Sequence, residues 1–213
     1  MSSVKNAAYE RFQQALLEGK LRPGQLLSQK DLVSLLALSI GALRELLPRL
    51  QAEGLLTVMP QRGIQITVID LPMIRDAFQM RIALEREAVI SALKTLPDAV
   101  LLEQRERHIA VVERVRTAPT EADLDAGQSL DTEFHDLLIG STGNEVLIGS
   151  YNVNSSRIRL IKLDRIKLSA TTLPSAFADH LAVIDALLAR DRERSIAAIE
   201  AHIRNARERA IDL

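Results

Sequence analysis

The stretch LRELLPRLQAEGLLTVMPQRGIQITVI, residues 43–69, decides the fold of the amino-terminal part of the chain. Its leucines recur with the 3.6-residue period of a helix, and Gly54 follows the last of them as a stop signal. Two β-branched or apolar runs of about five residues come next, separated by Pro60 and Gly63. The stretch therefore predicts a helix followed directly by a β-hairpin.

Two further helices are expected before this stretch. Apolar residues at every fourth position predict a helix over residues 3–18 that ends at Gly19, and we expect LRPGQLL, residues 21–27, to be a turn. Ser28 and Asp31 have the spacing of a capping box for a short helix that ends near Leu36. Helix, helix, helix and hairpin, in this order, predict a winged helix-turn-helix.

The remainder of the chain has no strand signal, and prolines mark the boundaries of its helices. We expect a bundle of six helices, at about 72–95, 98–117, 120–140, 143–168, 174–189 and 191–211. The predicted fold class is mainly α, with a DNA-binding domain over residues 1–69 and a helical domain over residues 70–213.

Composition narrows the class of protein. Of the 213 residues, 47% are hydrophobic but only 3% are aromatic, which is typical of packed helices. Cysteine is absent, so a metal site would need nitrogen and oxygen ligands. Residues 1–70 carry a net charge of +2 and the rest −3, which is the sign expected of an amino-terminal domain that reads DNA. The longest near-apolar stretch is too short to span a membrane, and we expect a cytoplasmic protein with no membrane partner.

Several motifs resemble those of the GntR family of transcription regulators. The turn GKLRPGQLLS, the LREL and RLQAEGLL segments of the third helix and QRG at the wing tip resemble its DNA-binding domain. The second half resembles the helical ligand-binding (FCD) domain of the FadR-type branch, in its shorter six-helix, VanR-like version. The resemblance covers essentially the whole chain and implies a regulator that is not an enzyme.

The same resemblance implies a divalent metal site. In these regulators the site comes from a D-x-x-F-H motif, a later Gly-Asn turn and two more histidines, and this chain carries the whole pattern. The implied ligands are Asp131, His135, His180 and His202. Residues four apart share a helix face, so Asp131 and His135 can bind one ion. Imidazole and carboxylate ligands suit zinc first, and also nickel, cobalt or manganese, better than calcium or magnesium.

Candidate DNA contacts come from positions that match the recognition helix and the wing of the family. They are Lys30, Ser39, Arg44, Arg49, Gln61 and Arg62. An arginine such as Arg44 can bind guanine through two hydrogen bonds, whereas Lys30 and Arg49 are expected to contact phosphate or support the helix. Two departures from the family affect docking: Ile40 replaces a common arginine, and Pro48 should kink or perturb the third helix.

Effector-binding candidates lie in the second half. Arg81 matches an arginine that pairs with an effector carboxylate in related ligand domains, and guanidinium geometry suits that role. Asn152 and Arg159 lie seven residues apart on one expected helix face and are further candidates. His108 matches no family position and is expected at the surface, and Asn205 is a candidate support for the metal site.

The leading hypothesis is a homodimeric repressor of a catabolic or transport operon. It would bind double-stranded operator DNA and be released by a small effector, expected to carry a carboxylate, next to the metal. Two alternatives remain. The bundle could be only a metal-stabilised dimerisation module, or the His135-Asp136 dipeptide with His108 upstream could belong to a metal-dependent phosphohydrolase.

Overall fold

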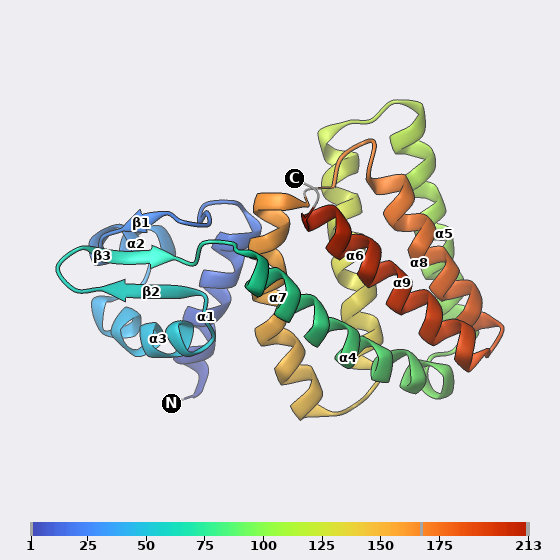
Figure 1. The fold of residues 1–213 in the computed structure, drawn as a ribbon, viewed down its shortest axis with the longest axis horizontal. Coiled ribbons are helices and arrows are strands. Elements are labelled where there is room, and N and C mark those ends of the chain that lie inside the picture. The colour runs from blue at the N-terminus through green and yellow to red at the C-terminus, as the bar shows by residue number, and fades with distance from the viewer. Residues whose placement is uncertain (1, 167, 212–213) are drawn as a thin grey trace. The chain divides into compact units, whose positions relative to one another are not determined.

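The computed structural model describes residues 2–166 and 168–211 of the chain (Figure 1). In these residues nine helices and three short strands follow one another in the order α1, β1, α2, α3, β2, β3 and then α4 to α9. The mainly helical fold class is confirmed. The chain divides into two compact units, Met1–Ile74 with Val153–Arg165, and Arg75–Asn152 with Ile166–Leu213. The functional division at residues 69 and 70 stays a prediction.

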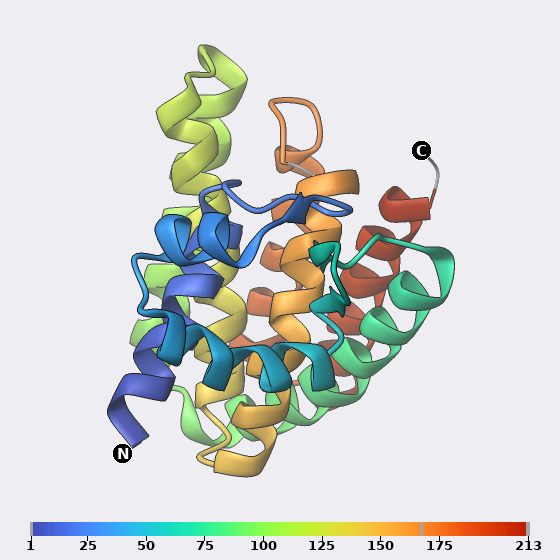
Figure 2. The same cartoon turned by 90° about the vertical axis from the view of Figure 1, so that its left-hand side faces the viewer.

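The first unit contains the three expected amino-terminal helices, which face the viewer in Figure 2: α1 (Ser2–Leu17), α2 (Gln29–Leu36) and α3 (Ile40–Ala52). The predicted capping box is present at the start of α2, because Ser28 Oγ accepts the Asp31 N–H at 3.1 Å and the Asp31 carboxylate accepts the Ser28 N–H at 3.0 Å. Helix α3 continues through Pro48 to its end at Ala52, so the proline does not terminate it.

A small antiparallel sheet completes this unit. The expected hairpin consists of β2 (Leu56–Met59) and β3 (Gly63–Ile66), and β3 also pairs with β1 (Leu26–Leu27), which gives the strand order β1-β3-β2. The turn expected within residues 21–27 is present at residues 23–24, but the strand at Leu26–Leu27 was not expected. A strand of two residues is too short to show an alternating pattern, and it exists because β3 supplies its hydrogen-bonding partners.

Six helices follow, as expected. They are α4 (Leu71–Thr95), α5 (Asp98–Thr117), α6 (Glu121–Gly140), α7 (Glu145–Arg165), α8 (Leu173–Leu188) and α9 (Arg192–Ile211). Their ends differ from the expected ones by at most three residues, although the expected end of the fourth at 168 lies beyond residue 167, which is outside the described residues.

Helix α8 is central to the packing of the second unit, because it contacts α5, α6 and α9 (Figure 1). The turn between α8 and α9 contains Arg190 in the left-handed region, with φ 54°, and brings the two helices side by side. An apolar cluster that includes Val115, Leu130 and Phe177 fills the space between α5, α6 and α8. The helices that carry the four candidate metal ligands are therefore neighbours.

Gly63, at the start of β3, provides a test of the sheet. Its φ is +115°, and a Cβ atom there would lie 2.5 Å from the carbonyl oxygen of Leu27. We expect Gly63→Ala to lower the free energy of unfolding by about 1–3 kcal/mol, measured by urea denaturation, because the backbone is strained and β1 is pushed away. Gly149→Ala in α7 meets no neighbouring atom within 4 Å and should be neutral or stabilise by up to about 1 kcal/mol. An equal loss of free energy of unfolding in both variants would show that a side chain at position 63 does not displace β1.

Candidate metal centre and DNA-binding surface

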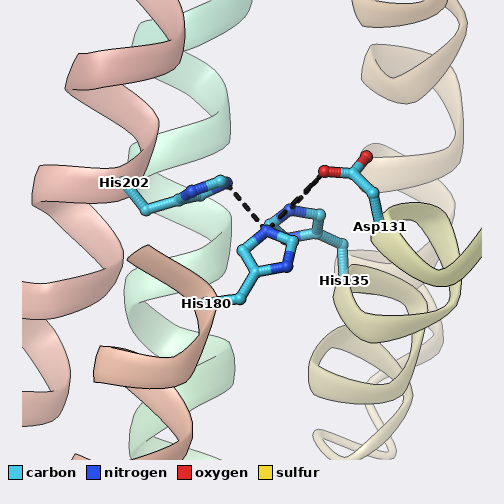
Figure 3. A group of neighbouring side chains, drawn as sticks. All are labelled: Asp131, His135, His180 and His202. Atoms are coloured by element: carbon cyan, nitrogen blue, oxygen red, sulfur yellow. Dashed lines mark hydrogen bonds and ion pairs between the residues drawn. The ribbon is translucent and has the colours of Figure 1, made fainter. Parts of the chain in front are cut away.

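The four predicted metal ligands converge inside the helical unit (Figure 3). Asp131 and His135 lie one turn apart on α6, His180 comes from α8 and His202 from α9. One potential ligand atom from each residue lies within 4.8 Å of all the others. Side chains from α6 and from the consecutive helices α8 and α9 thus share one point in space.

The distances within this group suit a single small cation. The Nε2 atoms of His180 and His202 are 3.3 Å apart, and Asp131 Oδ1 lies 3.6 Å from His180 Nε2 and 4.0 Å from His135 Nε2. In a tetrahedral zinc site with bonds of about 2.0–2.1 Å, neighbouring ligand atoms are roughly 3.3 Å apart. The group therefore fits such an ion after shifts of less than about 1 Å in the side chains. All four side chains are buried, which shields them from competing water.

His135 is held by a buried ion pair. The Arg81 Nε donates to Glu85 Oε1 at 2.5 Å, and the other oxygen of Glu85 accepts the His135 Nδ1–H at 2.7 Å. The Arg81 Nη2 donates to His135 Nε2, so that Arg81, Glu85 and His135 are each hydrogen-bonded to the other two. Burial opposes ionisation of Glu85, but the Arg81 guanidinium and His135 lower the pKa of Glu85 to about 2. A carboxylate on the outer nitrogen of a metal-binding histidine is the usual way to fix its orientation.

His202 also faces a carboxylate. Its Nδ1 lies 3.8 Å from Asp179 Oδ2, which is ion-pair range but too long for a hydrogen bond. Asn205 donates to both oxygens of Asp179, at 3.2 and 3.1 Å. Burial raises the pKa of Asp179, but His202 and Asn205 outweigh it, so that this pKa lies below its ordinary value. Asn205 therefore contacts the candidate metal site only indirectly, through the carboxylate of Asp179, which faces His202.

His108 does not lie at the surface, as the sequence suggested; it is fully buried on α5. Its Nε2 lies 3.0 Å from the Nδ1 of His180, and its Nδ1 lies 2.6 Å from the main-chain oxygen of Gln104. The apolar pattern of α5 explains the error, because the buried positions Leu101, Gln104, His108 and Val111 form one stripe at helical spacing. That stripe was the sequence signal for its burial.

Burial keeps the imidazoles of all four histidines neutral, those of the three candidate ligands and that of His108. It lowers the pKa of His108 and of His202, and together with the charge of Arg81 it lowers the pKa of His135 to about 4. The pKa of His180 lies well below its ordinary value, because burial is reinforced by the neighbouring histidines. Neutral imidazoles are the form that binds metal ions.

The three effector candidates have different surroundings. Arg81 is buried and already paired with Glu85 and His135. Asn152 is exposed on α7, and Arg159 is half-buried in the part of α7 that clusters with the first unit. Tyr151, which the sequence did not single out, is buried, and the charges of Glu85 and Arg81 act on its hydroxyl. It is an additional polar group near the Arg81 network.

The DNA candidates Lys30, Ser39, Arg44, Arg49, Gln61 and Arg62 are all exposed. Ser39 caps α3, as expected, by accepting the Ala42 N–H at 3.1 Å. Arg49 has a structural role, since it pairs with Glu53 at 2.9 Å and its guanidinium lies 3.6 Å from the centre of the Tyr9 ring. Gln61 lies at the hairpin tip with φ 59°. Arg44 is exposed one turn into α3, and its contact with a base stays a prediction.

Comparison with known families decides the class of protein. The model described as "Bacterial regulatory proteins, gntR family" matches residues 4–66, and the FCD domain model matches residues 76–205. The chain belongs to the GntR family and carries an FCD domain. It is a DNA-binding transcription regulator and not an enzyme.

Individual relatives agree with this assignment. The Nta operon transcriptional regulator of Aminobacter aminovorans is 30% identical, covering 85% of this chain and 82% of its own. The HTH-type transcriptional repressor GlaR of Escherichia coli is 26% identical, covering 92% and 90%. The solved structure of E. coli McbR/YncC has the same fold, with a TM-score of 0.75 at 20% identity, over 96% of this chain and 95% of that one.

The structure bears on one of the alternatives for this GntR-family chain. The phosphohydrolase alternative was wrong, because Asp136 is exposed and does not join the four converging residues. Among the described residues, no helix is long and apolar enough to cross a membrane.

Several residues of the site were missed. Glu85 accepts a hydrogen bond from His135, and His108 lies within hydrogen-bonding distance of His180, whereas Asp179 faces His202 at 3.8 Å without a hydrogen bond. Glu85 lies four residues after Arg81, a spacing that suggests an ion pair but not its burial. Asp179 precedes His180 in the sequence yet faces His202, a relation that only the packing of α8 against α9 produces.

The low pKa of His135 makes a prediction for the metal-free protein. Its pKa is about 4 in the folded state and near 6.5 when exposed, so the unfolded chain binds more protons between these values. The stability that depends on this ring is complete above about pH 6.5, and roughly 3 kcal/mol should be lost as the pH falls to about 4. Urea denaturation of chelator-treated protein across this range measures it. His135→Asn keeps a donor for Glu85 but cannot titrate, so its pH dependence should be shallower; identical curves would contradict the assignment.

Proposed function

We propose that this regulator is a metal-dependent, effector-responsive repressor that acts as a homodimer on double-stranded operator DNA. Asp131, His135, His180 and His202 bind one divalent transition metal ion, zinc first, and a small effector with a carboxylate binds beside it. The observation that carries the proposal is the convergence of these four buried side chains.

The hydrogen-bonding partners support a cation at this point. His135 and His180 each use Nδ1 as a donor to a neighbour, which leaves a lone pair on Nε2. The Nε2 of His180 and of His202 and a carboxylate oxygen of Asp131 then face one another at 3.3–3.6 Å. Two imidazole nitrogens and a carboxylate oxygen, buried together, are ligands that a divalent transition metal ion would bind.

Arg81 links the metal to the effector. Its guanidinium now occupies the Nε2 of His135, the same lone pair that metal coordination requires. A metal ion held by His135 would use this lone pair, so Arg81 would have to give up the contact, and the two positive charges would also repel each other. Arg81 then remains paired with Glu85 and has free N–H groups to receive an effector carboxylate. A bound transition metal supplies a Lewis-acidic centre that can accept an effector oxygen.

The DNA-reading role belongs to the first unit. The exposed side chains on α2, on α3 and at the hairpin tip suit a helix in the major groove and a wing on the flanking backbone. A symmetric dimer would bind a pseudo-palindromic operator, and effector binding would favour a spacing of the two heads that does not fit it. A preference of about 1–3 kcal/mol is enough for regulation. The name of GlaR, a repressor, supports repression here.

Metal binding is tested by a matched pair of aspartates on α6. Asp131→Asn removes a carboxylate that faces the histidines, whereas Asp136→Asn makes the same change at an exposed position. At a zinc concentration of 100 times its Kd, the wild type and Asp136→Asn should gain about 2.7 kcal/mol in free energy of unfolding. Asp131→Asn should gain much less at the same zinc concentration, as measured by urea denaturation.

Two further results decide between the alternatives for the bundle. Equal zinc stabilisation of both variants would show that the ion binds elsewhere. If the zinc-loaded wild type binds no small carboxylate in a thermal-shift screen and none alters its affinity for DNA, the bundle is a metal-stabilised dimerisation module and the effector part of the proposal is wrong.

Operator binding is tested with Arg44→Ala, on a DNA duplex that the wild-type protein selects from a random library. Loss of a base contact should weaken binding by about 1–3 kcal/mol, measured by fluorescence anisotropy at one fixed salt concentration. Arg105→Ala is the control, because Arg105 pairs with Asp185 in the helical unit. If Arg44→Ala binds as tightly as the wild type, α3 does not read the DNA through this residue.

A further inference from the structure

His108 forms a hydrogen-bonded chain that ends at the metal site. The chain starts at the main-chain oxygen of Gln104, runs through both ring nitrogens of His108 and reaches the Nδ1 of His180. The Nε2 of His180, on the opposite side of that ring, faces Asp131 and His202. His108 itself is not one of the four converging residues.

The direction of each hydrogen bond follows from the first one. A carbonyl oxygen only accepts, so the Nδ1 of His108 must carry the proton that it shares with Gln104. In a neutral ring the Nε2 is then an acceptor, and the proton of the second bond must come from the Nδ1 of His180. His180 is thereby left with its lone pair on Nε2.

Packing keeps the His108 ring in this orientation. Its centroid lies 5.3 Å from that of Phe134, in an edge-on arrangement, and 4.7 Å from that of Phe177. The ring is fully buried, so no water competes for its nitrogens. A rotation that exchanged the two nitrogens would break both hydrogen bonds in an apolar environment.

We propose that His108 is a positioning residue of the metal centre, which accepts the Nδ1 proton of His180 and so fixes the tautomer that presents Nε2 to the ion. Of the three histidine ligands, His135 and His202 face carboxylates, Glu85 and Asp179, with their outer nitrogens. His180 has a neutral imidazole in the same place. The inference rests on the proposed metal site and adds a role for a side chain outside the ligand set.

Two substitutions distinguish the role of His108 as a hydrogen-bond acceptor from its role in filling space. His108→Leu fills a similar space without an acceptor, whereas His108→Gln can offer its side-chain oxygen near the position of Nε2. Loss of such a partner typically weakens metal binding by about 10–100-fold, so we expect this loss in His108→Leu and a much smaller one in His108→Gln. Zinc affinity is measured by competition with a chromogenic chelator. Val115→Ala, two turns along α5, is the control for a loss of core packing.

Ring ¹⁵N NMR of the metal-free protein gives a second readout that packing alone does not change. The wild type and His108→Gln should hold His180 with its proton on Nδ1, and His108→Leu should lose this preference. Unchanged zinc affinity in His108→Leu, or a proton on Nε2 of His180 in the wild type, would overturn the role of His108 while the metal site stands. No zinc binding by the wild type would remove the proposed function, and this inference with it.

Discussion

The constraint on which the helical unit depends is the burial of polar side chains in a core made almost entirely of aliphatic residues. Seven polar side chains of this unit are nearly inaccessible to water: Arg81, Glu85, His108, Asp131, His135, His180 and His202. An unsatisfied polar group in such a place costs roughly 1–3 kcal/mol, and a charged group costs more. Their side chains are therefore tied into networks of hydrogen bonds and ion pairs that fix the positions of α4, α5, α6, α8 and α9.

The two nitrogens of each candidate ligand imidazole face different neighbours. The outer Nδ1 atoms of His135, His180 and His202 face Glu85, His108 and Asp179. The Nε2 atoms of His180 and His202 lie 3.3 Å apart, and that of His180 lies 3.6 Å from Asp131 Oδ1. Imidazole and carboxylate ligands at these distances suit a divalent transition metal ion. At His135 the Nε2 accepts from Arg81, and the proposed coupling of metal and effector binding depends on this contact.

The first unit follows simpler rules. Helices α2 and α3 begin at side-chain caps, and its sheet is held by the central strand β3. Gly63 allows β1 to approach β3, because any side chain there would meet the Leu27 carbonyl group. The charged and polar candidates for DNA contact remain on the outside, since the apolar face of α3 is buried through Leu43, Leu46, Leu47 and Leu50.

The sequence alone determined the helices, the hairpin and the family. Helix periodicity, caps and prolines are local signals, so the helix boundaries were close to those observed. It also identified Asp131, His135, His180 and His202, through the family pattern and not through geometry. Only the tertiary structure decided what surrounds them. The partners Glu85, His108 and Asp179 are set by packing between different helices, and β1 exists only because β3 pairs with it. Contacts of this kind depend on distances across the core, which no local pattern encodes.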